Sequence, residues 1–168
     1  NNSVFFISDV EGYVSINDWG DVDADQLLAD FRENTEALNK ERVENGFDPV
    51  YVVGWIQKPT LDKSTSTVYW SIESKMGDPA ENYFNSIALR LGRHGYETSI
   101  WVGDMSQYKA SGGELDTMMK AHAFDPGHTY SDFVSTDKLA GYGIASLVAA
   151  TAGAKALKAG FFGILFKK

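Results

Sequence analysis

A run of sixteen residues without a charged side chain, from Leu139 to Ala154, constrains this chain more than any other feature of its sequence. As an α-helix, such a run extends for about 24 Å, against a bilayer hydrocarbon core of about 30 Å. Lys155 and Lys158 follow it, and their long side chains can reach the polar interface and close this small deficit. The run therefore predicts a C-terminal transmembrane helix.

The charges are divided unevenly between the two parts of the chain. The net charge is −8, yet every acidic residue lies at or before Asp137. By the positive-inside rule, the basic end is cytoplasmic and the acidic part lies outside the cytoplasm. We expect an acidic soluble domain over residues 1–133 and a membrane-anchoring helix with a basic end over residues 134–168. The cations expected at the membrane interface are Lys155, Lys158, Lys167 and Lys168.

Two alternatives remain for the uncharged run. Sixteen residues are short for a membrane span, so the run also fits a buried helix in the core of a soluble protein. Alternatively, residues 139–166 form one long span in which Lys155 and Lys158 face a water-filled lumen or the interior of an oligomer.

Small residues recur at four-residue spacing along this segment. In lipid, such stripes allow helix backbones to approach closely, which favours packing against another helix. The pattern predicts a homo-oligomer or a complex with a membrane-protein partner. The expected packing residues are Ala145, Ala149 and Gly153 on one stripe, and Ala152, Ala156 and Gly160 on the next.

The region before the tail has the pattern of an α+β domain. Asp23 fits the N-cap of a helix whose apolar face includes Leu27 and Phe31. Four strand-like segments follow, and their short connections leave no room for helices, which predicts an antiparallel β-meander. The expected strands are residues 50–57, 67–74, 83–91 and 96–102, with a further strand at 4–8 and a second helix at 115–124. The predicted fold is α+β, an antiparallel meander of about four to five strands packed with helices, plus the C-terminal transmembrane helix.

Patterns typical of catalytic and metal sites are sparse. The chain has no Cys and three His, which excludes a thiolate zinc site and limits nucleophile–base pairs. His122, Asp125, His128 and Asp132 lie within eleven residues. The Pro126-Gly127 step interrupts any helical face there, so we interpret the group as part of a turn rather than a metal site.

Three further patterns receive a structural interpretation. Asp21, Asp23 and Asp25 suit a helix N-terminus better than a calcium loop, which requires Gly at its sixth position and Glu at its twelfth. Gly141-Tyr142-Gly143 resembles the start of a dinucleotide fingerprint but opens no βαβ unit. The acidic balance argues against a nucleic-acid partner. We assign no catalytic, cofactor-binding or metal-binding residue.

Several segments resemble one bacterial family. They are Gly12-Tyr13-Val14 with Asp18-Trp19, residues 33–36 and 39–42, Val53-Gly54-Trp55, Leu91-Gly92-Arg93 with Gly95, and Phe124-Asp125-Pro126-Gly127-His128 with Tyr130, Asp132-Phe133 and Thr136-Asp137-Lys138. The family is the DUF2167 group of uncharacterised, membrane-anchored bacterial proteins. The resemblance covers nearly the whole chain. It implies a secreted N-terminus with a further stretch upstream of Asn1, and a C-terminal membrane anchor, but no activity.

Two functions are compatible with these observations. The first is a structural or assembly role for an extracytoplasmic domain held by a single-pass helix in the bacterial inner membrane, whose partners are the lipid bilayer and copies of itself or another membrane protein. The alternative is a membrane-tethered hydrolase or ligand-binding module in the periplasm. It requires a pocket between sheet and helix with polar side chains such as Arg93, His128 or Asp132.

Overall fold

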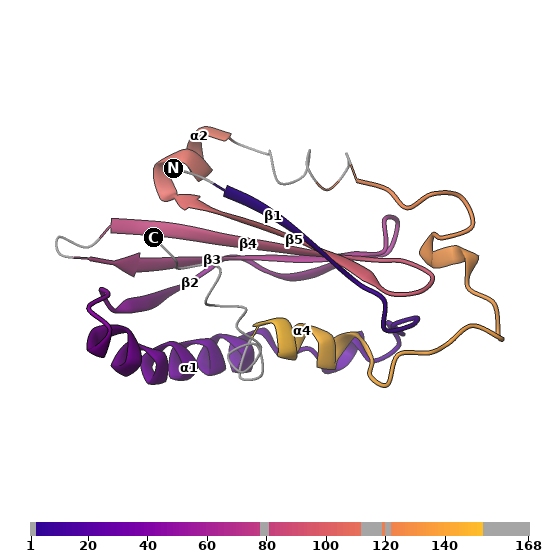
Figure 1. The fold of residues 1–168 in the computed structure, drawn as a ribbon, viewed down its shortest axis with the longest axis horizontal. Coiled ribbons are helices and arrows are strands. Elements are labelled where there is room, and N and C mark those ends of the chain that lie inside the picture. Colours follow the sequence, from indigo (N-terminus) through magenta and orange to yellow (C-terminus); the bar gives the residue numbers. More distant parts are fainter. Residues whose placement is uncertain (1–2, 78–80, 112–118, 120–121, 153–168) are drawn as a thin grey trace.

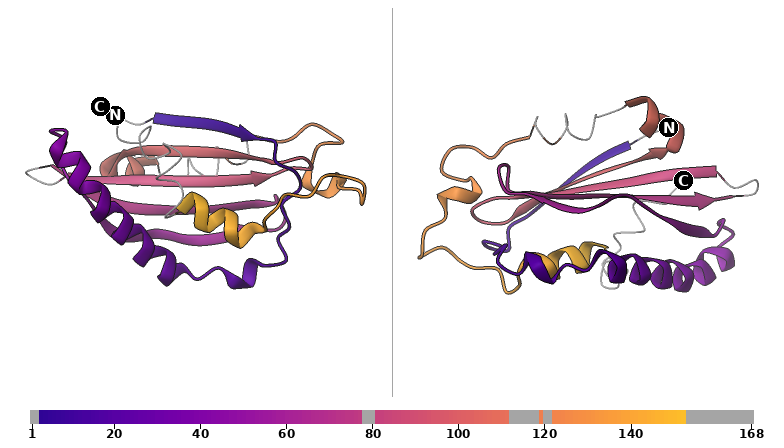
Figure 2. Two further views of the ribbon diagram at one scale, coloured as in Figure 1. Left: turned by 60° about the horizontal axis from the view of Figure 1, so that its bottom comes forward. Right: turned by 180° about the vertical axis from the view of Figure 1, so that it is seen from behind.

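The computed structural model describes residues 3–77, 81–111, 119 and 122–152. In these residues one antiparallel sheet has the strand order β1-β5-β4-β3-β2, and helices α1 and α4 lie along the same face of it (Figures 1 and 2). The α+β class and the meander are therefore confirmed. The elements are β1 (Ser3–Asp9), η1 (Trp19–Asp21), α1 (Ala24–Glu44), β2 (Val50–Asp62), β3 (Thr67–Met76), β4 (Glu81–Leu91), β5 (Tyr96–Asp104), α2 (Met105–Ser111), η2 (Tyr130–Asp132) and α4 (Ile144–Ala152).

The strands pair so that alternate residues form the core. Trp70 of β3 lies opposite Ile87 of β4, which lies opposite Ile100 of β5, and all three side chains are buried. Strand β1, the first in the chain, pairs with the last strand, β5, along the far edge of the meander. Of the helix expected at residues 115–124, residues 122–124 are irregular, and residues 115–118, 120 and 121 lie outside the described residues.

Helix α1 covers the sheet with the face that its sequence predicts. The Asp23 carboxylate accepts hydrogen bonds from the backbone N–H groups of Asp25 and Gln26, each at 3.0 Å, and caps the helix. Leu27 and Phe31 are buried against the sheet, and each contributes about 1.5–3 kcal/mol. The Trp55 indole Nε1 of β2 donates to the Ala24 carbonyl at 3.0 Å, which fixes the start of the helix over the sheet.

Helix α4 takes up the middle of the uncharged run as part of the domain core. Ile144, Leu147 and Val148 are each 0–4% exposed and join the main hydrophobic cluster. Among the described residues, no helix has both the length and the apolar character needed to span a membrane. The transmembrane helix expected from this run is therefore not found, and its residues 144–152 follow the buried-helix alternative instead. The hydrophobic core of the described residues thus includes Ile144, Leu147 and Val148.

The physical reason is that α4 is amphipathic by size rather than by charge. Ile144, Leu147 and Val148 lie at the i, i+3 and i+4 positions of one helical face. On the remaining surface Ala149 is exposed and Ala145 is partly exposed. Self-association through the small residues stays a prediction. Gly153, Ala156, Gly160, Lys155, Lys158, Lys167 and Lys168 lie outside the described residues, as does the side chain of Ala152.

Candidate functional site

The turn between β4 and β5 is held between two other segments of the chain. Gly92-Arg93-His94-Gly95 closes this hairpin, with the Gly92 N–H donating to the Gly95 carbonyl at 2.8 Å. A Cβ atom at Gly95 would lie 1.9 Å from the backbone oxygen of Asp9, and one at Gly92 would lie 2.8 Å from the Phe124 ring. The turn therefore requires glycine at Gly95, where the backbone of β1 approaches so closely, whereas a side chain at Gly92 would have to displace the Phe124 ring.

One side of the hairpin, its fastened side, is bonded to residues 122–140, a segment that comes after β5 and α2 in the chain. The Arg93 N–H donates to the His128 carbonyl at 3.0 Å, and its guanidinium forms a two-bond ion pair with Asp137, Nε to Oδ2 at 2.7 Å and Nη2 to Oδ1 at 3.0 Å. This guanidinium is the main cause that lowers the pKa of Asp137 to about 2. Asp137 also accepts from the Val134 N–H at 2.9 Å. Arg93 and Asp137 thus join the hairpin to this segment.

Aromatic stacking and one hydrogen bond fix the same segment to residues 12–14, and a capping box stabilises the turn within it. The Tyr13 ring stacks on the rings of Tyr130 and Phe133, with centroid distances of 4.4 and 4.1 Å. The Tyr130 hydroxyl donates to the Val14 carbonyl at 2.9 Å. Asp132 accepts from the Thr129 N–H at 2.9 Å and from its hydroxyl at 2.6 Å. These bonds from Thr129 lower the pKa of the Asp132 carboxyl.

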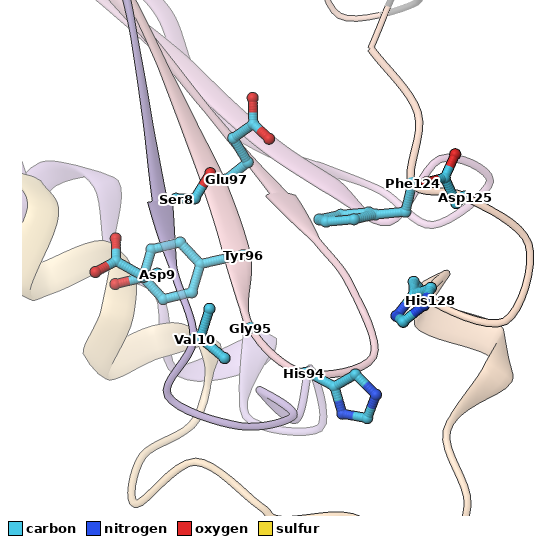
Figure 3. A pocket seen from close by; sticks show the side chains of 10 residues that line it. All are labelled: Ser8, Asp9, Val10, His94, Gly95, Tyr96, Glu97, Phe124, Asp125 and His128. Atoms are coloured by element: carbon cyan, nitrogen blue, oxygen red, sulfur yellow. The ribbon is translucent and has the colours of Figure 1, made fainter.

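The other side of the hairpin is open and forms a cavity of about 330 Å³. Figure 3 shows the Phe124 ring pointing across it toward the strands, with Ser8 and Glu97 side by side on neighbouring strands. The imidazoles of His94 and His128 lie near the hairpin tip, with ring centroids 5.8 Å apart. The lining residues are Ser8, Asp9, Val10, His94, Gly95, Tyr96, Glu97, Phe124, Asp125 and His128.

Glu97 contributes a carboxylate to the lining, next to an imidazole. His122 Nε2 lies 3.1 Å from its Oε2, within reach of charge attraction but not aligned for a hydrogen bond. The His122 ring in turn meets the Phe124 ring edge-on, with centroids 5.6 Å apart. All three histidines of the chain therefore lie around this hairpin. The arrangement combines a carboxylate, imidazoles and an aromatic face.

Asp9 and Tyr96 lie on the opposite side of their strands in Figure 3. Tyr96 shares side-chain hydrogen bonds with Asp9 and Tyr142, and the Tyr142 hydroxyl donates to Glu11. Burial is the main cause that raises the pKa of Asp9, and the charge of Glu11 adds to it. This network ties the end of β1 to the residues before α4. Of these residues, Asp9 and Tyr96 line the cavity, at its margin.

A family model described as a protein of unknown function, DUF2167, matches residues 1–168. The chain belongs to the DUF2167 family. No curated protein and no solved structure matches it.

In this DUF2167 chain, three residues were expected to line a pocket. The side chains of Arg93 and Asp132 instead form hydrogen bonds with Asp137 and Thr129. The His128 ring lines the cavity, and its backbone carbonyl accepts from the Arg93 N–H. The described residues contain no group of three or more side chains arranged to hold a metal ion.

Sequence reasoning missed His94, Glu97 and Ser8 as lining residues. Alternation along β5 puts Glu97 on the face opposite Ile100, but only the pairing of β1 with β5 brings Ser8 beside it. Gly141-Tyr142-Gly143, which resembles the start of a dinucleotide fingerprint, has a structural role instead. It leads into α4, and a Cβ at Gly143 would lie 2.2 Å from Asp18 Oδ2, so the glycine makes room for a carboxylate at a helix N-terminus.

Proposed function

We propose that this domain binds a small cationic molecule in the cavity beside the β4–β5 hairpin. One observation carries the proposal: Glu97, Phe124 and His128, from segments about thirty residues apart in sequence, line one open cavity of about 330 Å³. An apolar wall with a few convergent polar groups is typical of small-molecule sites.

The chemistry of the lining favours a positively charged group. The ring face of Phe124 and the carboxylate of Glu97 both attract an ammonium ion, and a neutral imidazole of His94 or His128 can accept a hydrogen bond from it. The chain as a whole has a net charge of −8, which favours the approach of cations over anions. Asp125 adds a further carboxylate at the margin.

Binding is a better match to this site than hydrolysis. Of the residues expected for the hydrolase alternative, His128 lines the cavity, but the guanidinium of Arg93 and the carboxylate of Asp132 are held in hydrogen bonds away from it. The polar groups that remain on the lining suit recognition of charge.

The test compares three probes of similar size that differ in charge, namely benzylamine, benzyl alcohol and phenylacetate. Each is titrated into ¹⁵N-labelled full-length protein while the amide resonances are followed by NMR. We expect benzylamine to shift the resonances of residues 94–97 and 124–128, with much smaller effects from the other two. Equal responses to all three probes, or none to benzylamine, would refute the proposal.

A matched pair of variants locates the charge requirement. Glu97→Gln removes the carboxylate and should weaken benzylamine binding at least about tenfold, equivalent to about 1.4 kcal/mol. Glu36→Gln removes an exposed carboxylate on α1 and should leave binding unchanged. Equal weakening by both variants would indicate a general charge effect and no defined site.

We also propose that residues after α4 attach the domain to a bacterial membrane, with the domain outside the cytoplasm and with a role in assembly. The support is the sequence of residues 153–168, which includes Phe161-Phe162 and four lysines but no acid. Because α4 lies in the core, residues 153–166 remain as the apolar stretch. As a helix they extend about 21 Å, shorter than a hydrocarbon core of about 30 Å, which favours attachment with the lysines at the lipid headgroups.

Vesicle flotation tests this attachment. Full-length protein should float with vesicles containing anionic phosphatidylglycerol and float less with phosphatidylcholine alone. Replacing Lys155 and Lys158 by Glu should abolish flotation, whereas Lys40→Glu and Lys63→Glu, at exposed sites in the domain, should not. Protein that stays at the bottom of the gradient with both kinds of vesicle would overturn the proposal.

A further inference from the structure

The two edges of the sheet are built differently. At the β2 edge, the pairing with β3 shifts register three times, at Val52/Gly54, Trp55/Gln57 and Gln57/Thr60, and the strand also contains Lys58 and Pro59. Bulges, lysine and proline are the features by which natural sheets prevent their edge strands from pairing with other chains. The β2 edge is therefore protected against such pairing.

The β1 edge has none of these features. Its seven residues, Ser3 to Asp9, pair with β5 in unbroken register. From Ser3 to Ser8 there is no ionisable side chain and no proline. Among the described residues, no strand pairs with the outer side of β1. A regular edge strand presents alternate backbone N–H and C=O groups to whatever lies beside it.

The side chains along β1 are also unusually apolar for a surface. Val4 is 39% exposed, Phe6 is 58% exposed, and Val10 just beyond the strand is 81% exposed. Val4 and Phe6 have the same parity along the strand, so both project from the face opposite the core. An exposed, regular and apolar edge of this kind is a ready site for strand addition.

We propose that β1 pairs antiparallel with β1 of a second copy about a two-fold axis, so that one continuous sheet runs through both copies. A strand is self-complementary in the antiparallel arrangement, as an isologous interface requires. Each copy has a net charge of −8, so two copies repel each other over most of their surfaces and can approach most easily along an uncharged edge. The neutral stretch Ser3–Ser8 lets two copies meet without facing charges. This pairing is independent of the cavity and of the tail.

The experiment measures the mass of full-length protein in mild detergent by light scattering. Wild-type protein should have twice the mass of the single chain. Phe6→Lys places a charge in the middle of the edge and should halve the mass, while its far-UV circular dichroism stays close to wild type because Phe6 is exposed. Tyr51→Lys, at a 61% exposed site on β2, is the matched control and should remain a dimer.

Hydrogen exchange then identifies the paired strand. In the wild type every amide of β1 should be protected, half by β5 and half by the second copy. In Phe6→Lys the alternate, outward-facing amides should exchange fast, while those bonded to β5 stay protected. A wild-type monomer, or a dimer that survives Phe6→Lys, would overturn the proposal. A dimer disrupted only by changes in residues 153–168 would instead assign assembly to the tail.

Discussion

The two sides of the β4–β5 hairpin carry similar residue types but use them in opposite ways. On the fastened side, Arg93 and Asp137 join two separate segments through hydrogen bonds of 2.7 and 3.0 Å, and Asp132 caps its own turn by accepting from Thr129 at 2.6 Å. On the cavity side, the carboxylate of Glu97 and the ring of His128 line an open space. Residues of similar type around this hairpin therefore either hold the chain together or line the cavity. Their positions in the fold, and not their chemical type, separate the two placements.

The largest expected effect on stability comes from Gly95, because the hairpin backbone lies directly against the end of β1 at this residue. Gly95→Ala puts a methyl group 1.9 Å from the Asp9 oxygen, and relieving that overlap requires a backbone shift that costs about 3 kcal/mol. Chemical denaturation measures the loss. Gly54→Ala, where a Cβ meets nothing within 4 Å, is the control and should change stability little. A tolerated Gly95→Ala would mean that β1 is not held at the hairpin.

Asp137→Asn should have the next largest effect and reveals its cause through pH. The folded pKa of Asp137, about 2, lies below its ordinary value of 3.8. Its ionised form therefore adds stability that is fully present above about pH 4 and is lost as the pH falls through about 2. The variant should melt several degrees below wild type at pH 7, and the gap should close near pH 2. A gap independent of pH would show that lost hydrogen bonding, not charge, is the cause.

Tyr130→Phe removes one hydrogen bond on the fastened side and keeps the aromatic stack. The Val14 carbonyl, on a residue that is 0% exposed, then loses its donor, which costs about 1 kcal/mol. Denaturant midpoints measure this loss. Benzylamine binding should be unchanged, because the hydroxyl is not on the cavity. Weaker binding in this variant would show that the two sides are coupled.

The smallest expected effect on stability is that of His128→Asn, which separates the two roles of one residue. The backbone carbonyl still accepts from the Arg93 N–H, and the side chain is exposed, so stability should change by less than about 0.5 kcal/mol. Benzylamine binding should weaken, as measured by the same NMR titration. Unchanged binding would remove the His128 ring from the proposed site.

Local patterns in the sequence were sufficient to predict much of the fold. Alternation and short turns identified β2 to β5, and the Asp23 cap marked the start of α1. The C-terminal run was misinterpreted because alanines surround the Ile144, Leu147 and Val148 stripe. Without charged residues on its outer side, a core helix resembles a membrane helix in composition.

The candidate site could be predicted only in part. The interpretation of residues 122–132 as a turn is consistent with the capping box of Asp132 and with Gly127 at φ 86°. The cavity itself depends on Ser8 lying beside Glu97, a contact between residues almost ninety positions apart. Periodicity in a short window carries no information about such long-range pairing.

The position of β1 at the far edge of the sheet also has a consequence during synthesis of the chain. This strand leaves the ribosome before the other four, but its partner β5 begins only at Tyr96. At about 5–20 residues per second, the gap between them takes roughly 5–20 s to translate. Throughout that interval the apolar segment from Val4 to Ile7 has no native strand to pair with. The length of this unpaired interval is therefore set by topology and translation speed, whatever the final stability of the domain.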